Sequence, residues 1–279
     1  MDLIVTLQCQ DQPGIVHAMT TAILGCNGNI IENQQFTDPV TNTFVMRTRF
    51  ESSMSLAEAR NHLDAGLSKF SPTIHLRATS DKKRALILVT TESHCLRDLL
   101  YLQELGELPV EIPVVVSNHK ELQPLVEAHG IPFAHLPVAS LGKEVAEQDL
   151  QKLISEHKID VLVLARYMQI LSPNFCRANK GSIINIHHSF LPGFKGAKPY
   201  HQVHDRGVKI IGATAHFVTE DLDEGPIIEQ DVAHVTHSAK PEDLVALGRD
   251  IERRVLSRAV RLFAEDRIFI VGSRTVVFA

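Results

Sequence analysis

From residue 85 onward, short apolar runs alternate with stretches of helical spacing. The apolar runs are Ala85 to Val89, Val110 to Val116, Phe133 to Leu136, Val161 to Leu164 and Ile183 to His187. The helical stretches are Cys95 to Leu105, Lys120 to His129, Lys143 to His157 and a long one from about Pro241 to Ala264. Strands that alternate with helices pair in parallel through crossover helices, and apolar strands are typical of sheets covered on both faces. Residues 85–279 are therefore predicted to form a Rossmann-like, doubly wound α/β domain.

The first 80 residues follow a different order. Strand-like runs are Leu3 to Leu7, Ile30 to Phe36, Thr43 to Phe50 and Ile74 to Arg77, and helical spacing covers about Ile15 to Gly25 and Ser55 to Phe70. This βαββαβ order predicts a ferredoxin-like domain over residues 1–80. The polar segment 81–84 is predicted to be a linker.

Composition narrows the class of protein. The chain has 44% hydrophobic and 22% charged residues, which is typical of a globular protein. A net charge of -5 argues against a nucleic-acid partner. No signal peptide or membrane-spanning apolar run is seen, so we expect a cytoplasmic protein without a membrane partner.

The densest polar cluster of the second domain is Asn-Ile-His-His-Ser-Phe-Leu-Pro at 185–192. It follows an expected parallel strand, and open α/β sheets bind ligands at the carboxyl ends of such strands. Asn185 and His187 would point to the same face because side chains alternate along a strand. An amide donor beside an imidazole suits acyl transfer, since one can stabilise an oxyanion while the other moves protons.

A second polar segment, Asp-Leu-Asp-Glu-Gly-Pro at 221–226, separates two extended segments, Lys209 to Val218 and Pro226 to Asp231. A carboxylate here could orient His187 and stabilise its charged form. Gly225 and Pro226 would let the loop turn tightly beside a ligand.

Sequence motifs in each predicted domain resemble those of a known protein family. Asp-Gln-Pro-Gly-Ile-Val at 11–16 and Asn-Gly-Asn-Ile at 27–30 resemble the ACT family of regulatory domains. This resemblance implies an amino-acid effector, with Asp11, Gly14, Asn27 and Asn29 as candidate contacts, and a homo-oligomer formed through sheet edges. An alternative hypothesis is a non-catalytic amino-acid sensor, in which this domain carries the function of the protein.

The second resemblance covers about residues 84–279. The segment 185–192, followed by Gly-Ala-Thr-Ala-His-Phe-Val at 212–218 and Leu-Asp-Glu-Gly-Pro-Ile-Ile at 222–228, resembles the folate-dependent formyltransferase superfamily. It implies that Asn185, His187 and Asp223 are catalytic and that the substrate is 10-formyltetrahydrofolate. No separate cofactor is implied.

The acceptor of the formyl group is indicated by a third segment. Members that transfer the group to a phosphorylated amine have a glycine- and serine-rich loop after the first strand of this domain, where backbone amides hold the phosphate. Here the segment is Thr-Thr-Glu-Ser-His-Cys at 90–95, with no glycine and one acidic residue. The chain therefore resembles the hydrolytic members, in which water takes the formyl group and formate is released. Transfer to an amine acceptor is the alternative, and formate release without acceptor would distinguish the two.

The resemblance also implies a pterin pocket formed by the segment 166–172. We expect substrate contacts at Gln169, Ile170, Leu171, His188, Glu220 and Gly225. The chain has 15 histidines, but none lies in an HExxH motif and no cysteine pair accompanies them, so no metal is expected. His201 and His204 could form at most one weak site, and Lys195, Lys198 and Tyr200 are expected at the pocket entrance.

Overall fold

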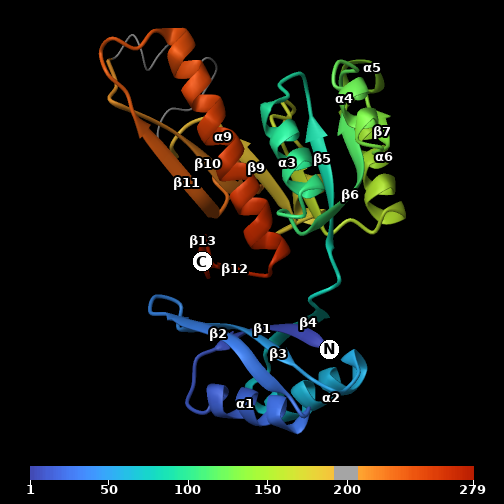
Figure 1. Ribbon diagram of the computed structural model, residues 1–279, viewed down its shortest axis with the longest axis vertical. Coiled ribbons are helices and arrows are strands. Elements are labelled where there is room, and N and C mark those ends of the chain that lie inside the picture. Colours follow the sequence, from blue (N-terminus) through green and yellow to red (C-terminus); the bar gives the residue numbers. More distant parts are fainter. Residues whose placement is uncertain (192–206) are drawn as a thin grey trace. The chain divides into compact units, whose positions relative to one another are not determined.

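The computed structural model describes residues 1–191 and 207–279, and the chain divides into two compact units. Unit 1 consists of residues 1–82 and 265–279, and unit 2 consists of residues 83–264 (Figure 1).

Unit 1 contains the predicted ferredoxin-like arrangement. Its elements are β1 (Asp2–Gln10), α1 (Ile15–Gly25), β2 (Asn29–Asp38), β3 (Thr43–Glu51), α2 (Leu56–Leu67), the 3-10 helix η1 (Ser68–Phe70) and β4 (Thr73–Ala78). The strands form an antiparallel sheet in the order β2-β3-β1-β4. A capping box between Ser55 and Glu58 begins α2. The βαββαβ prediction is confirmed.

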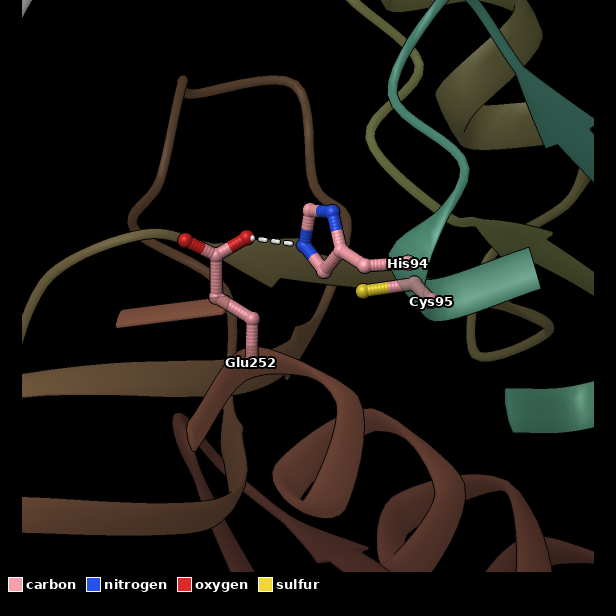
Figure 2. Close-up of side chains that lie close together, drawn as sticks. All are labelled: His94, Cys95 and Glu252. Carbon is pink, nitrogen blue, oxygen red and sulfur yellow. Dashed lines mark hydrogen bonds and ion pairs between the residues drawn. The ribbon is translucent and has the colours of Figure 1, made fainter. Parts of the chain in front are cut away.

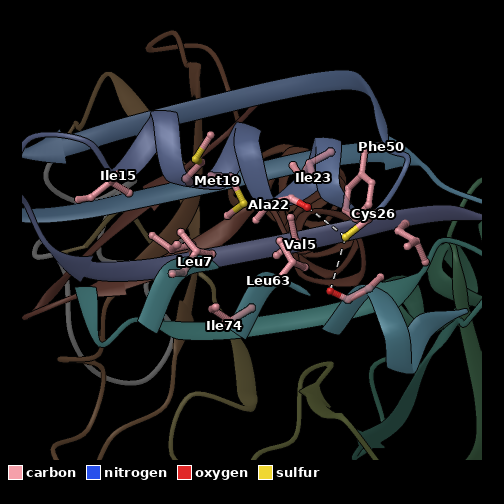
Figure 3. Packing of buried hydrophobic residues seen from close by; sticks show 14 of the residues in the cluster. Val5, Leu7, Ile15, Met19, Ala22, Ile23, Cys26, Phe50, Leu63 and Ile74 are labelled. Atoms are coloured by element: carbon pink, nitrogen blue, oxygen red, sulfur yellow. Dashed lines mark hydrogen bonds between the residues drawn. The ribbon is translucent and has the colours of Figure 1, made fainter. Parts of the chain in front are cut away.

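One face of this sheet packs against α1 and α2 around a buried core (Figure 3). The core includes Val5, Leu7, Ile15, Met19, Ile23, Phe50, Leu63 and Ile74. Strand β3 alternates, so that Phe44 and Met46 join this core while Val45 and Arg47 occupy the opposite face. All four of these side chains are buried.

The opposite face is covered by a hairpin from the end of the chain. The hairpin consists of β12 (Ile268–Val271) and β13 (Arg274–Val277). Phe269, Val271 and Phe278 pack against Val45, and the Nε atom of Arg47 donates to the carbonyl of Glu265 at 2.9 Å. The prediction that residues 85–279 form the second domain is therefore wrong at its end. Residues 265–279 belong to unit 1 because their apolar side chains cover its sheet.

Unit 2 is the predicted α/β domain. Its sheet has the order β11-β10-β9-β8-β5-β6-β7. The strands are β5 (Lys83–Val89), β6 (Val110–Ser117), β7 (Phe133–His135), β8 (Val161–Leu164), β9 (Ile183–His187), β10 (Ile210–Phe217) and β11 (Ile227–His234). Strands β5 to β9 pair in parallel, whereas β10 is antiparallel to both β9 and β11. Because β5 begins at Lys83, the predicted linker 81–84 is shorter than expected.

Helices cover both faces of this sheet. The described helices are α3 (His94–Glu104), α4 (Gln123–Ala128), α5 (Val138–Leu141), α6 (Lys143–Glu156), α7 (Pro173–Ala178) and α9 (Pro241–Ala264). Helices α6 and α7 bury Leu150 and Phe175 against one face. Helices α3 and α9 contact each other, and α9 also contacts β9, β10 and β11. Within the described residues, no helix combines the length and the apolar character that crossing a bilayer requires.

Candidate active site

Strand β9 presents the predicted amide and imidazole. Asn185 and His187 point to the same face, while Ile184 and Ile186 are buried on the other. His187 is the last residue of the strand and is 7% exposed. The chain after it is fixed by Thr214, whose hydroxyl donates to the carbonyl of Ser189 at 3.0 Å.

A histidine that the sequence analysis did not assign to the site lies opposite Asn185. His216 on β10 pairs directly with Asn185 in the antiparallel register, and Nδ2 of Asn185 lies 3.2 Å from Nε2 of His216. Nδ1 of His216 lies 2.9 Å from the carbonyl oxygen of Phe217, which can only accept, so this nitrogen carries a proton. The other ring nitrogen, Nε2, faces the Asn185 amide.

The loop between β10 and β11 brings in Asp223. Its Oδ2 lies 3.3 Å from Nδ1 of His187, and its Oδ1 lies 3.6 Å from Nε2 of His216. Asp223 has φ of 57°, in the left-handed region that aspartate tolerates better than most residues. The three predicted catalytic residues are thus brought together.

The electrostatics of the site favour a charged carboxylate. The hydrogen bond from His187, and then the neighbouring His216, hold the pKa of the Asp223 carboxyl far below its usual value, against the opposing effect of burial. Ionised Asp223 can only accept, so Nδ1 of His187 carries the proton and Nε2 is the basic nitrogen. Nε2 of His187 is buried and has no hydrogen-bond partner among the described residues.

A cavity of about 350 Å³ adjoins these residues. Its lining includes all three of Asn185, His187 and Asp223. Met168, Ile170 and Leu222 also line it and are 58%, 65% and 59% exposed. Apolar side chains left in solvent around a hollow are typical of a ligand site.

Most of the predicted substrate contacts lie at this cavity. The residues found in its lining are Gln169, Ile170, Leu171, His188 and Glu220. Gly225 is not in the lining: it is buried beside the carbonyl of Phe217, where it shapes the loop, and its contact with the substrate stays a prediction. The lining also contains three residues that were not predicted as substrate contacts, Arg166, Met168 and Leu222.

One group in the described part of the chain has the side chains of a metal site. The ligand atoms of His94, Cys95 and Glu252 lie within 4.8 Å of one another (Figure 2). However, Nε of Arg166 lies 3.5 Å from Oε2 of Glu252, and burial raises the pKa of the Cys95 thiol well above its usual value. A guanidinium already balances the carboxylate and the thiol stays protonated, so these residues do not fit a metal ion. His201, His204, Lys195, Lys198 and Tyr200 lie outside the described residues.

The candidate effector residues of unit 1 fall into two separate groups. Asp11 and Gly14 precede α1, and Asn27 and Asn29 follow it. Helix α1 has 11 residues, so its ends are roughly 16 Å apart. The two groups thus lie at opposite ends of one helix, and their role as effector contacts stays a prediction.

Known proteins share this fold. A family model described as formyl transferase matches residues 83–260. A formyltetrahydrofolate deformylase of Corynebacterium sp. (strain P-1) is 46% identical over 277 residues, with 98% of this chain and 97% of the relative covered. The crystal structure of a formyltetrahydrofolate deformylase from Burkholderia mallei superposes with a TM-score of 0.96 at 43% identity and covers 100% of this chain and 99% of that one. A glycinamide ribonucleotide transformylase from Symbiobacterium toebii has a TM-score of 0.68 at 29% identity and covers 74% of this chain and 97% of its own.

Fold and site thus define a catalytic unit of the formyl transferase class. Similarity to the deformylases extends over both units, whereas the transformylase covers only part of the chain. The chain belongs to the formyltetrahydrofolate deformylase family.

Proposed function

We propose that the protein hydrolyses 10-formyltetrahydrofolate to formate and tetrahydrofolate. The observation that carries the proposal is the pairing of His187 Nδ1 with Asp223 Oδ2 at 3.3 Å, beside a cavity that Asn185 also lines. The family membership supports the same activity.

In the proposed reaction, water attacks the formyl carbon. Nε2 of His187 takes a proton from the attacking water, and Asp223 stabilises the imidazolium that results. The Asn185 amide and the imidazolium stabilise the oxyanion of the tetrahedral intermediate. His187 then returns the proton to N10, the bond between carbon and N10 breaks, and formate leaves.

The pterin would lie against the segment from Gln169 to Leu171. Gln169 offers polar groups to the amide-like edge of the pterin, and the exposed side chain of Ile170 offers an apolar contact to its flat face. Such a polar and an apolar contact suit a pterin, because aromatic heterocycles combine an apolar face with a polar rim.

The test is formate release from 10-formyltetrahydrofolate with no amine present. Release of one formate per tetrahydrofolate, unchanged by added glycinamide ribonucleotide, is the expected result. Turnover that requires an amine, with formylated amine as the product, would instead establish the transferase. No turnover at all, together with amino-acid binding, would establish the sensor.

Regulation by an amino acid is a separate proposal. One end of α1 would contact the ligand, and two copies of the chain would be needed for Asp11 and Asn29 to reach the same molecule. The unpaired edge of β2, with Ile31 half exposed, suits such pairing between copies in a homo-oligomer. Calorimetry of the full chain with each amino acid tests effector binding, and light scattering tests the oligomeric state.

We also propose a cytoplasmic location, where reduced folates and purine precursors are found.

A further inference from the structure

Glu252 is a buried carboxylate that the proposed reaction does not use. It lies in the middle of α9, is 1% exposed, and is absent from the cavity lining. Its Oε2 lies 2.8 Å from Nε2 of His94 and 3.5 Å from Nε of Arg166 (Figure 2 shows the contact with His94). A buried charge is costly unless it is paired, so these contacts indicate a site at which the carboxylate has a defined role.

Arg166 connects Glu252 to the cavity. It follows β8 with φ of 65°, a left-handed conformation that is unfavourable for an arginine. The side chain is held between Glu252 on one side and His188 on the other, where Nη1 lies 2.7 Å from Nδ1 of His188. Backbone strain of this kind persists only where surrounding contacts hold the residue in place.

The contact between Arg166 and His188 determines where the histidine carries its proton. A guanidinium has donors only and stays charged in proteins. Nδ1 of His188 must therefore be an acceptor, which leaves the ring neutral with its proton on Nε2.

His188 in turn contacts the proposed base. Its ring stacks on that of His187, with centroids 4.9 Å apart and an angle of 20° between the planes. A neutral ring supports His187 without placing a second positive charge beside the imidazolium that forms during the reaction. The stacking also limits rotation of His187 away from Asp223.

We propose that Glu252 is a positioning residue, which acts through Arg166 to hold His188 as a neutral ring against His187. His94 completes the arrangement by contacting Glu252 from the start of α3. The inference rests on the proposed hydrolysis, but it concerns residues outside the Asn185, His187 and Asp223 set.

The first test replaces Glu252 with glutamine. Glu252→Gln keeps the shape of the side chain and removes its charge, and we expect kcat to fall on the order of 10-fold or more while KM changes less than about 3-fold, because outer contacts orient groups that act on the substrate. The matched control is Glu229→Gln. Glu229 lies on β11 and pairs with Arg258 of α9, the helix that also carries Glu252, at 3.0 Å. Because Glu229 does not line the cavity, kcat and KM should both stay near the wild-type values.

The second test uses Arg166→Gly, which removes the guanidinium and relieves the left-handed backbone, so that the variant should fold. If the two residues act in series, the double variant is no slower than the slower single variant. Thermal unfolding of each variant separates an effect on kcat from loss of the fold.

Each outcome bears on the inference. Independent, multiplicative effects of Glu252→Gln and Arg166→Gly would overturn it, as would a rise in KM at unchanged kcat, which would make Arg166 a substrate contact. Equal losses in Glu252→Gln and Glu229→Gln that follow the unfolding temperature would also overturn it. Failure of the proposed function is distinct, because it appears as absent formate release in the wild-type protein.

Discussion

A β-carbon on Gly225 would lie 1.7 Å from the carbonyl oxygen of Phe217. The backbone of Phe217 also donates to the carbonyl of Pro226 at 2.9 Å, so the loop closes on itself where β10 ends and β11 is about to begin. Asp223 sits inside this closed loop. Its position relative to His187 therefore depends on a residue that has no side chain.

We expect Gly225→Ala to reduce formate release by about 100-fold or more, since the loop must open to admit a methyl group and Asp223 then leaves His187. Gly25→Ala is the control, because the backbone of Gly25 is helical and a β-carbon there would make only an ordinary contact, 3.5 Å from Nδ1 of His62. Wild-type turnover by Gly225→Ala would show that the loop adapts without moving Asp223.

Asn185→Ala should lower kcat by roughly two orders of magnitude, because loss of one oxyanion donor costs on the order of 3 kcal/mol in the barrier. The KM should change little, since the amide acts mainly on the tetrahedral intermediate. Steady-state formate release measures both constants. Full turnover by this variant would remove Asn185 from the proposed mechanism.

The charge of Asp223 should make a pH-dependent contribution to stability. Its pKa is lowered in the folded protein, so the stabilisation is complete above the unfolded value of about 4 and is lost as the pH falls through the lower folded value. The free energy of unfolding of wild type minus that of Asp223→Asn should therefore shrink as the pH falls below about 4. Urea unfolding at a series of pH values checks this, and a difference that grows as the pH falls below about 4 would contradict the direction of the pKa shift.

Val271→Ala should destabilise unit 1 by about 2 kcal/mol, because Val271 is 3% exposed in the cluster that covers the sheet. Val40→Ala is the matched control, with the same change at a position that is 76% exposed, and should have almost no effect. Calorimetric unfolding gives both values. Equal transitions for the two variants would mean that the hairpin does not stabilise unit 1.

Local patterns predicted much of the fold and of the catalytic set. The alternation of apolar runs identified the parallel strands, and the two-residue period along β9 placed Asn185 and His187 on one face. Asp223 was predicted from its resemblance to a known motif, since nothing in the spacing alone relates it to His187.

The contacts that were missed depend on register and on long-range return of the chain. His216 faces Asn185 because β9 and β10 pair in one particular register, which local sequence does not reveal. Glu252 is buried although it lies in a helix whose first turn is acidic, so its sequence suggests a solvated side chain. Arg47 and Glu32 form an ion pair, and Arg267 joins Glu32 from the end of the chain, a contact between positions more than 200 residues apart.

The return of residues 265–279 to unit 1 has a consequence for biosynthesis. A ribosome makes the whole of unit 2 before it makes the strands that shield Val45 and Arg47. One apolar face of the sheet in unit 1 therefore stays uncovered while unit 2 is translated. During this time chaperones can bind that face. A message truncated before codon 265 would yield a polypeptide with every proposed catalytic group but with an apolar sheet face of residues 1–82 permanently exposed.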